Sequence, residues 1–269
     1  MNTLNFKTGL IVSAALLLAN SAYANPDAVA RSSHGTAGIY AGATTYRRFP
    51  SPHTSKPSPV FGAVSDAGTG YFISASAASS EIRVFQNLKG SGKVASPESE
   101  VPTEGQGVAR GAQAWPMDIK PADSSGHPDT LQATFNCGDC VIGLNLEQQP
   151  LTQQQVSLSS KAGAYQGADV NRLTKVTLTL DAMGRFTGTD ATGCNLTGTL
   201  AQVGHLNLFG VSLTLSGASA CHGAMTGVAF FDTQDRTGQV STAKGSYLYL
   251  LGANPDFSHG FAMALSHQP

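Results

Sequence analysis

The chain has 269 residues with a formal net charge of −1 at pH 7, and only 12% of its residues are charged. A near-neutral surface lacks the basic stripe that follows a phosphate backbone, so we expect no nucleic-acid partner. Hydrophobic residues make up 41% of the chain and glycine occupies 30 positions, a composition that excludes a disordered protein and is typical of an exported, β-rich one.

Residues 1–24 have the pattern of a cleavable export signal. Lys7 precedes an almost unbroken apolar stretch at residues 9–19, and Ala22-Tyr-Ala24 follows as a small-x-small cleavage site. The stretch is too short to hold the protein in a bilayer permanently. We therefore expect cleavage between Ala24 and Asn25 and a mature protein that is secreted, periplasmic or on the outer cell surface. No cysteine lies near this site, so we expect no lipid anchor, and no later segment is apolar for long enough to span a membrane.

Residues 25–146 are predicted to form a β-rich domain that carries the ligand site. Five segments combine β-branched or aromatic residues with Gly, Ser or Pro at their ends and are predicted strands: 38–46, 70–75, 81–86, 131–135 and 141–146. Two long segments between them, 50–59 and 90–128, are predicted to be irregular. The first is rich in proline, which has no amide proton to donate and is therefore unsuited to a central strand. The second is rich in Gly, Pro, Ser and Glu, and loops of this length commonly bind something or stay mobile.

Residues 147–160 are polar, Gln-rich and without periodicity, and we interpret them as a linker to a second domain at residues 161–269. Eight strands are predicted there, at 162–167, 174–180, 184–189, 194–201, 206–215, 223–231, 246–251 and 260–265. The connections are short, and Asp181-Ala-Met-Gly184 has the composition of a hairpin turn. Eight consecutive antiparallel strands can close on themselves and leave no exposed edge. We therefore predict an all-β fold, in which the N-terminal β-rich domain is followed by an eight-stranded antiparallel up-and-down barrel like that of lipocalins.

A short pattern recurs at the start of the first strand of each domain. Ala37-Gly-Ile-Tyr-Ala-Gly42 and Ala162-Gly-Ala-Tyr-Gln-Gly167 share the spacing Ala-Gly-x-Tyr-x-Gly. The recurrence fits two related barrels; the alternative is a chance match, which six residues rich in Gly and Ala produce easily.

Four cysteines follow the signal segment: Cys137, Cys140, Cys194 and Cys221. In an oxidising compartment an even number predicts two disulfides, and we expect each cysteine to pair with its nearest partner in sequence. Cys137-Gly-Asp-Cys140 lies between strand-like flanks, which favours a disulfide across a tight turn over thiol exchange, since exchange needs a following helix. A bridge between Cys194 and Cys221 would join two strand ends at one end of the barrel. Zinc is the alternative for these residues, but their spacing matches no standard zinc module, so we expect no metal site.

The candidate ligand residues lie in the first domain. His53 and His127 fall in the two irregular segments, and His53 follows closely on Tyr46, Arg47 and Arg48. An imidazole over an apolar cleft can ligate haem iron, and arginines can pair with the haem propionates. The alternative is that the two histidines are ordinary exposed loop residues.

No catalytic pattern is present in the sequence. No serine lies in Gly-x-Ser-x-Gly on a strand-to-helix turn, and there is neither a phosphate-binding loop nor a dinucleotide fingerprint. We therefore expect a protein that is not an enzyme and has no catalytic residues.

Three stretches of the second domain carry a resemblance to a known group: residues 176–188, beginning Val176-Thr-Leu-Thr-Leu180, residues 193–199 and residues 225–232. They are similar to the eight-stranded C-terminal barrels of Gram-negative secreted and surface proteins, a group that includes the transferrin-binding-protein B barrels and the small haemophilin-type haem carriers. The resemblance implies an N-terminal ligand domain and a barrel that helps to present the protein to an outer-membrane translocator of the surface-lipoprotein-assembly type.

These observations predict a non-enzymatic secreted binding protein for a small apolar or haem-like ligand, with haem the first ligand to test and the barrel as scaffold or export module. The alternative is an envelope or surface interaction protein of the adhesion type, which would bind a protein partner or a host surface through its Gly/Pro/Ser-rich loops.

Overall fold

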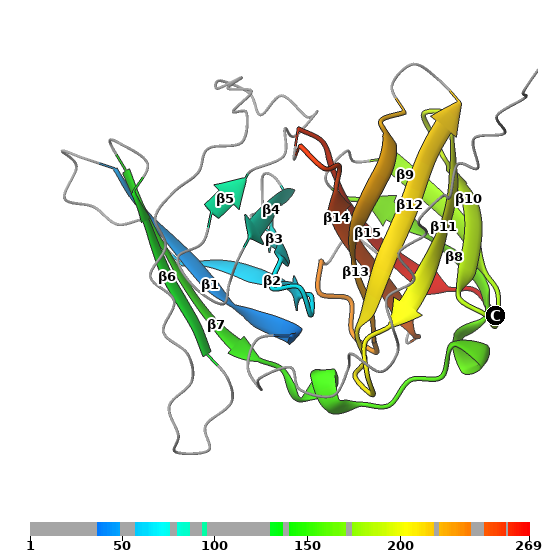
Figure 1. Cartoon of the computed structure of the whole chain (residues 1–269), viewed down its shortest axis with the longest axis horizontal. Helices are drawn as coiled ribbons and strands as arrows, with labels where there is room; N and C mark the ends of the chain where they lie inside the picture. The colour runs from blue at the N-terminus through cyan, green and yellow to red at the C-terminus, as the bar shows by residue number, and fades with distance from the viewer. Residues whose placement is uncertain are drawn as a thin grey trace, which may run out of the picture. The chain divides into compact units, whose positions relative to one another are not determined.

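The computed structural model describes residues 37–48, 57–75, 80–86, 93–95, 130–136, 140–170, 174–217, 221–237, 245–256 and 258–269. Within them the chain is all-β, as predicted: a seven-stranded antiparallel sheet is followed by a closed eight-stranded antiparallel barrel (Figure 1). Sheet and barrel belong to one compact unit. No helix in this described part is long and apolar enough to cross a membrane. The predicted signal segment lies outside it.

The sheet has the strand order β5-β4-β3-β2-β1-β7-β6, and every neighbouring pair is antiparallel. Its strands are β1 (Gly38–Arg48), β2 (Ser58–Val64), β3 (Gly70–Ala75), β4 (Ser80–Gln86), β5 (Lys93–Ala95), β6 (Thr130–Asn136) and β7 (Cys140–Gln148).

Two of these strands were not predicted. Strand β5 falls within the segment 90–128 that we expected to be irregular, and β2 begins inside the proline-rich segment 50–59. Strand β2 is central, yet it includes Pro59. The proline is tolerated because it lies at the beginning of the strand: Pro59 is opposite Ala43 of β1, whereas β3 pairs with β2 only from Val60 onward. No backbone hydrogen bond to β3 is therefore needed at Pro59, which has no amide proton to donate.

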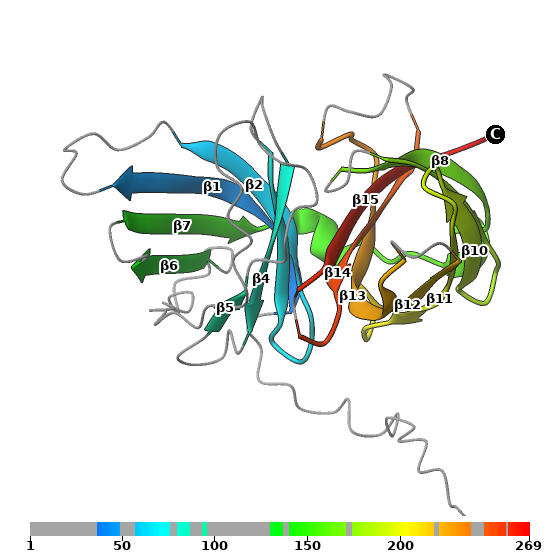
Figure 2. The same cartoon turned by 90° about the horizontal axis from the view of Figure 1, so that it is seen from above.

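The barrel strands are β8 (Gly163–Asp169), β9 (Thr174–Leu180), β10 (Arg185–Asp190), β11 (Cys194–Gln202), β12 (Phe209–Gly217), β13 (Gly223–Asp232), β14 (Tyr247–Ala253) and β15 (Gly260–His267). They follow one another around the barrel, and β15 pairs with β8 to close it (Figure 2). All eight predicted strands are confirmed, and each begins and ends within three residues of the predicted position.

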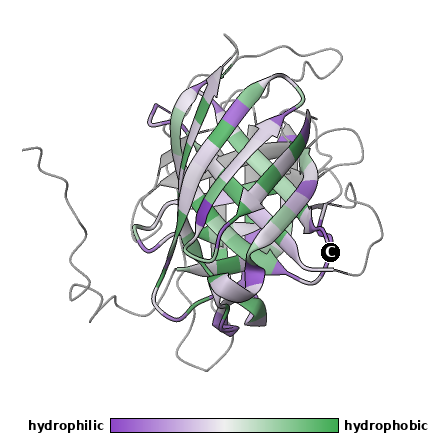
Figure 3. Ribbon diagram, turned by 90° about the vertical axis from the view of Figure 1, so that its right-hand side faces the viewer, coloured by the Kyte–Doolittle hydropathy of each residue, from purple (hydrophilic) through white to green (hydrophobic). Residues whose placement is uncertain are grey.

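The barrel interior holds a first hydrophobic cluster, the inner core. Strands β9 and β12 alternate buried and exposed residues, which gives the bands of opposite hydropathy along the barrel strands in Figure 3. The inner core is formed by inward-facing side chains of all eight strands, among them Tyr165, Val176, Phe186, Leu196, Leu213, Met225, Leu250 and Phe261.

Strands β13 to β15 differ from the other barrel strands because they are buried on both faces. All seven residues of β14 and the first six of β15 are buried. Their outward side chains form a second cluster, the outer core, with side chains of the sheet, including Ile39, Phe61, Ala63, Tyr71 and Ile73. The Phe61 ring meets the Tyr249 ring edge-on at a centroid distance of 5.3 Å, and the Phe230 ring stacks on Tyr249 at 5.1 Å. The sheet therefore packs on this apolar part of the barrel wall.

The segment between sheet and barrel is itself packed. It contains two single-turn 3-10 helices, η2 (Pro150–Gln153) and η3 (Leu158–Lys161). Thr152 is fully buried and its hydroxyl accepts a hydrogen bond from the Ile39 amide at 2.9 Å. Val156 and Leu158 pack against the inner core. Strand β7 extends to Gln148, so the first two residues of the predicted linker belong to the sheet.

Candidate functional site

The barrel interior contains a packed hydrophobic core. Glycines at inward-facing positions allow large rings to fill it. A Cβ at Gly198 would collide with the Phe186 ring, and a Cβ at Gly252 would lie 2.5 Å from the Phe261 ring. Phe261 and Phe186 are both buried in the inner core.

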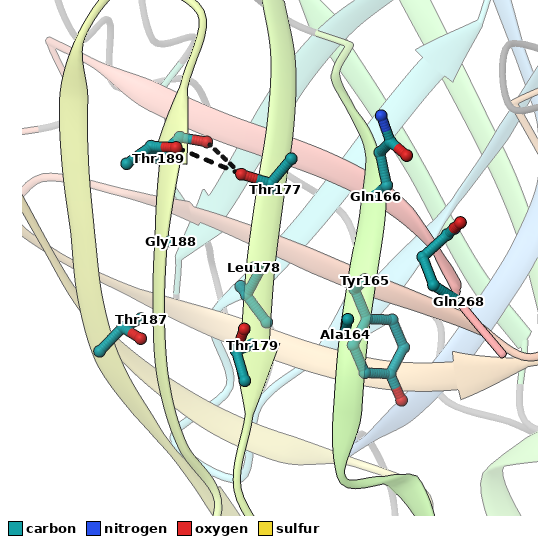
Figure 4. A pocket seen from close by; sticks show the side chains of 10 residues that line it. All are labelled: Ala164, Tyr165, Gln166, Thr177, Leu178, Thr179, Thr187, Gly188, Thr189 and Gln268. Carbon is teal, nitrogen blue, oxygen red and sulfur yellow. Dashed lines mark hydrogen bonds between the residues drawn. The ribbon is translucent and has the colours of Figure 1, made fainter.

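The outer face of the barrel carries an open groove over β8, β9 and β10, with a volume of about 470 Å³. We call it the hydroxyl groove and define it by its lining residues, Ala164, Tyr165, Gln166, Thr177, Leu178, Thr179, Thr187, Gly188, Thr189 and Gln268 (Figure 4).

Strand pairing sets out the groove side chains in two rows. Thr179 lies opposite Thr187 on the neighbouring strand, and Thr177 lies opposite Thr189. The Thr177 and Thr189 hydroxyls are 3.2 Å apart and share a hydrogen bond (Figure 4). All four threonines are exposed. Gln166 stands across from Thr177 on the other side, on β8.

The β8 side of the groove is firmly held. Tyr165 points into the barrel, and its hydroxyl donates to the Lys161 carbonyl at 2.6 Å. Burial raises the pKa of Tyr165, so its hydroxyl stays neutral at physiological pH. The Gln268 amide group donates to the Ser266 carbonyl and hydroxyl at 3.1 and 3.0 Å. This rim of the groove is therefore preorganised.

A histidine pair and a disulfide lie at one end of the barrel. Cys194, at the start of β11, is bonded to Cys221, just before β13, as predicted. The neighbouring His222 ring stacks on the His259 ring with centroids 3.6 Å apart and an angle of 11°. In the β14–β15 loop, a hydrogen bond from the Ser258 hydroxyl is the main cause that lowers the pKa of Asp256, and the charge of His259 contributes. Among the described residues, no group of three or more His, Cys, Asp or Glu is placed to hold a metal ion.

The residues predicted for ligand binding are only partly described. Tyr46, Arg47 and Arg48 end strand β1, opposite Ile142, Val141 and Cys140 at the start of β7. The Arg47 side chain is exposed. The structure does not describe the side chains of Tyr46, Arg48 and Cys140, and His53, His127 and Cys137 lie outside the described residues. The predicted Cys137–Cys140 bridge therefore stays a prediction.

The groove threonines are not among the site residues predicted from the sequence. Their signal is a Thr-x-Thr unit that recurs every ten residues, at Thr177-Leu-Thr179, Thr187-Gly-Thr189 and Thr197-Gly-Thr199. On its own this unit indicates only the polar face of a strand. The groove appears once the strand register places the units side by side.

No protein-family model matches the chain, and no curated protein matches it. The class that the fold defines is an open antiparallel sheet packed on a closed eight-stranded barrel. The eight-stranded barrel implied by the family resemblance is confirmed, whereas membership of that family stays a prediction.

Proposed function

We propose that this chain is a non-enzymatic binding protein that acts outside the cytoplasm, with the barrel as scaffold and the sheet domain as the main ligand-binding part. One observation carries the proposal: buried side chains of all eight strands pack together inside the barrel, which favours a role for the barrel as a rigid scaffold for a binding surface. The outer core supports it further, because it fixes the sheet on the barrel wall.

Export of the chain is part of the proposal. The Cys194–Cys221 disulfide is characteristic of an oxidising compartment, and residues 1–24 have the pattern of a signal peptide. The family resemblance adds a translocator of the surface-lipoprotein-assembly type as the outer-membrane exporter. Fractionation of the producing cells and N-terminal sequencing should give a mature chain that starts at Asn25. Full-length protein retained in the cytoplasm would overturn this part of the proposal.

Haem is the ligand we propose first, on the strength of the resemblance and of the histidines in the β1–β2 and β5–β6 connections. The proposed haem contacts are Tyr46, Arg47 and Arg48, with His53 or His127 as the iron ligand.

The test is a titration of haemin into the purified mature protein, followed in the Soret region. A shifted Soret band that is lost in His53→Ala or His127→Ala is the expected result. His205→Ala is the matched control, because His205 is an exposed histidine in the β11–β12 turn, far along the chain from the sheet. The spectrum of free haemin, unchanged by added protein, would remove haem as the ligand.

The second candidate is an envelope interaction protein of the adhesion type, and the edge strand β6 favours it. Strand β6 ends the sheet and has the sequence Thr-Leu-Gln-Ala-Thr-Phe-Asn, without charge or proline. Charged residues and proline are two common protections of an edge against pairing with another chain, and β6 has neither, so an extended segment of a partner protein can add to it. Retention of the mature protein on intact cells without any small ligand, measured by surface protease digestion, would favour this candidate over haem carriage.

A further inference from the structure

The hydroxyl-bearing surface on the side of the barrel formed by β8 to β12 extends beyond the hydroxyl groove. The register continues the row of Thr179 and Thr187 across two further strands, because Thr197 lies opposite Thr187 and Thr214 lies opposite Thr197. All four hydroxyl-bearing side chains are exposed. Neighbouring strands are about 4.8 Å apart and alternate residues along a strand about 6.6 Å apart, so these groups form a regular array of hydrogen-bonding sites.

The groove has polar groups available for a ligand. Within the described residues, no protein partner of the Thr179 and Thr187 hydroxyls or of the Gln166 amide is found, whereas Thr177 and Thr189 bond each other. A hydroxyl both donates and accepts, and a Gln amide offers two donors and one acceptor. The groove therefore suits a ligand that also presents donors and acceptors side by side.

Charge narrows the class of ligand. None of the ten groove residues is charged; the exposed Lys175 and Arg185 lie outside the groove, and Arg185 is paired with Asp181. Within the groove, a charged ligand would lose its hydration without meeting an opposite charge, and an apolar ligand would bury hydroxyls without partners. Protein partners generally need an apolar or aromatic centre in the interface. Among the described residues, Met183 is the exposed large hydrophobic side chain, and it does not line the groove.

We propose that the hydroxyl groove binds a neutral oligosaccharide, whose hydroxyls both donate and accept as those of the groove do. The groove is open, which fits a segment of a longer saccharide chain. This site is separate from the sheet-domain site of the proposed function, and the inference depends only on the general role of the protein as a binding protein. A failure to bind saccharides would leave the haemin titration, and the conclusion drawn from it, unaffected.

The first experiment uses the full mature chain on an array of immobilised neutral oligosaccharides, with linear chains of glucose, galactose, mannose and N-acetylglucosamine, and with sulfated and sialylated chains for comparison. Multivalent display raises the apparent affinity of single hydrogen-bonded sites. Binding to at least one neutral chain, at a level above that of the charged chains, is the expected result. No binding to any neutral chain, or binding confined to the charged chains, would overturn the proposal.

The second experiment locates the site with a matched pair of double variants. Thr179→Val with Thr187→Val removes two groove hydroxyls, and valine keeps the shape and the strand propensity of threonine. We expect the dissociation constant for the best array ligand to rise about tenfold, from the loss of two hydrogen bonds. Thr197→Val with Thr214→Val makes the same change in the same row outside the groove, and should leave the affinity unchanged. Equal effects of the two pairs, or no effect of the first, would overturn the assignment to the groove, and matching thermal unfolding curves show that both variants fold.

A different occupant gives a different result. If the groove is an interface between two copies of the chain, sedimentation of the wild type shows a dimer that the groove pair of substitutions dissociates, and the array shows no saccharide binding. That combination would replace the saccharide proposal.

Discussion

The side chain of Asn207 takes the place of a neighbouring peptide unit beside Phe231. Its Nδ2 donates to the Phe231 carbonyl at 2.7 Å, and its Oδ1 accepts from the Phe231 amide at 3.0 Å. Asn207 is fully buried, and its backbone amide donates a hydrogen bond to the Thr152 carbonyl at 2.9 Å. The Thr152 hydroxyl accepts in turn from the Ile39 amide. A continuous set of hydrogen bonds thus connects the sheet, the linking segment and the barrel.

Replacement of this side chain should weaken the fold strongly. Asn207→Ala leaves the buried amide and carbonyl of Phe231 without partners, and each such group costs about 1–3 kcal/mol. We expect the free energy of unfolding in urea to fall by about 2–4 kcal/mol. Asn195→Ala, at an exposed position of β11, is the control and should change it by less than about 0.5 kcal/mol. Equal stabilities of the two variants would show that the Asn207 bonds do not hold the barrel end.

The outer core should be sensitive to the contact between Phe61 and Tyr249. Both rings are buried, and Phe61→Ala should cost about 3–5 kcal/mol and expose the apolar wall of β13 to β15, which raises the fluorescence of a hydrophobic dye. Tyr249→Phe keeps the ring and loses two hydrogen bonds, one from the Arg236 amide at 2.7 Å and one to the Gln234 carbonyl at 3.0 Å. We expect that variant to lose about 1–2 kcal/mol and to bind no more dye than the wild type. If Phe61→Ala and Tyr249→Phe bound the dye equally, the result would contradict a packing role for the Phe61 ring on the barrel wall.

The Cys194–Cys221 disulfide closes a loop of 27 residues in sequence separation. Since a crosslink of this kind restricts the unfolded chain, the double variant Cys194→Ser with Cys221→Ser should unfold with a free energy about 2–4 kcal/mol lower than the wild type. A reductant should lower the melting temperature of the wild type to about that of the variant. If reductant also lowers the melting temperature of the double variant, that further decrease gives the contribution of the predicted Cys137–Cys140 bridge. An unaltered melting temperature of the reduced wild type would argue that the bond contributes nothing to stability.

The barrel could be predicted from the sequence because its physical signal is strong. In β9, inward Val176, Leu178 and Leu180 alternate with exposed threonines, and the turn residues Asp181 and Gly184 mark the next hairpin. The start of β12 is the largest deviation, at Phe209 instead of residue 206. The reason is Asn207, whose side chain replaces the backbone ladder at that point, an arrangement that residue periodicity does not reveal.

The recurring Ala-Gly-x-Tyr-x-Gly pattern has one structural cause in both domains. Tyr40 and Tyr165 are both fully buried. Gly42 and Gly167 both face a neighbouring backbone so closely that a Cβ would collide with a carbonyl oxygen, that of Asn145 in the sheet and that of Ala264 in the barrel. The repeated spacing therefore reports a close approach of two strands, whether or not the two domains share an origin.

The candidate site was harder to predict than the fold, for a physical reason. The groove is formed by threonines on adjacent strands, and whether such residues lie side by side depends on the register between strands. The double-sided burial of β14 does have a signal in the sequence, since Tyr247-Leu-Tyr-Leu-Leu251 lacks the polar alternation of the other barrel strands. A continuous apolar run in a barrel strand indicates that another layer covers it.

The stabilisation of the β9–β10 turn by Asp181 should depend on pH in the acid range, and this can be measured at the Asp181 carboxyl group. The Asp181 carboxylate accepts hydrogen bonds from the amides of Arg185 and Met183, each at 2.9 Å, and from the Arg185 Nε at 2.7 Å. These bonds, with the Arg185 amide the largest cause and the Arg185 side chain the second, hold the pKa of Asp181 below its usual 3.8. The folded protein thus binds this proton less tightly than the unfolded chain does. The stabilisation is complete above the unfolded pKa and is lost as the pH falls through the folded pKa.

Carboxyl NMR titration should therefore give Asp181 a midpoint below 3.8. Arg185→Gln removes the charged donor and keeps the backbone amides, so the midpoint should move up towards the unfolded value without reaching it. Asp181→Asn should remove the part of the decrease in the free energy of unfolding at acid pH that arises from Asp181. A wild-type midpoint at or above the unfolded value, or a midpoint that Arg185→Gln leaves in place, would show that the turn does not hold the carboxylate as its hydrogen bonds imply.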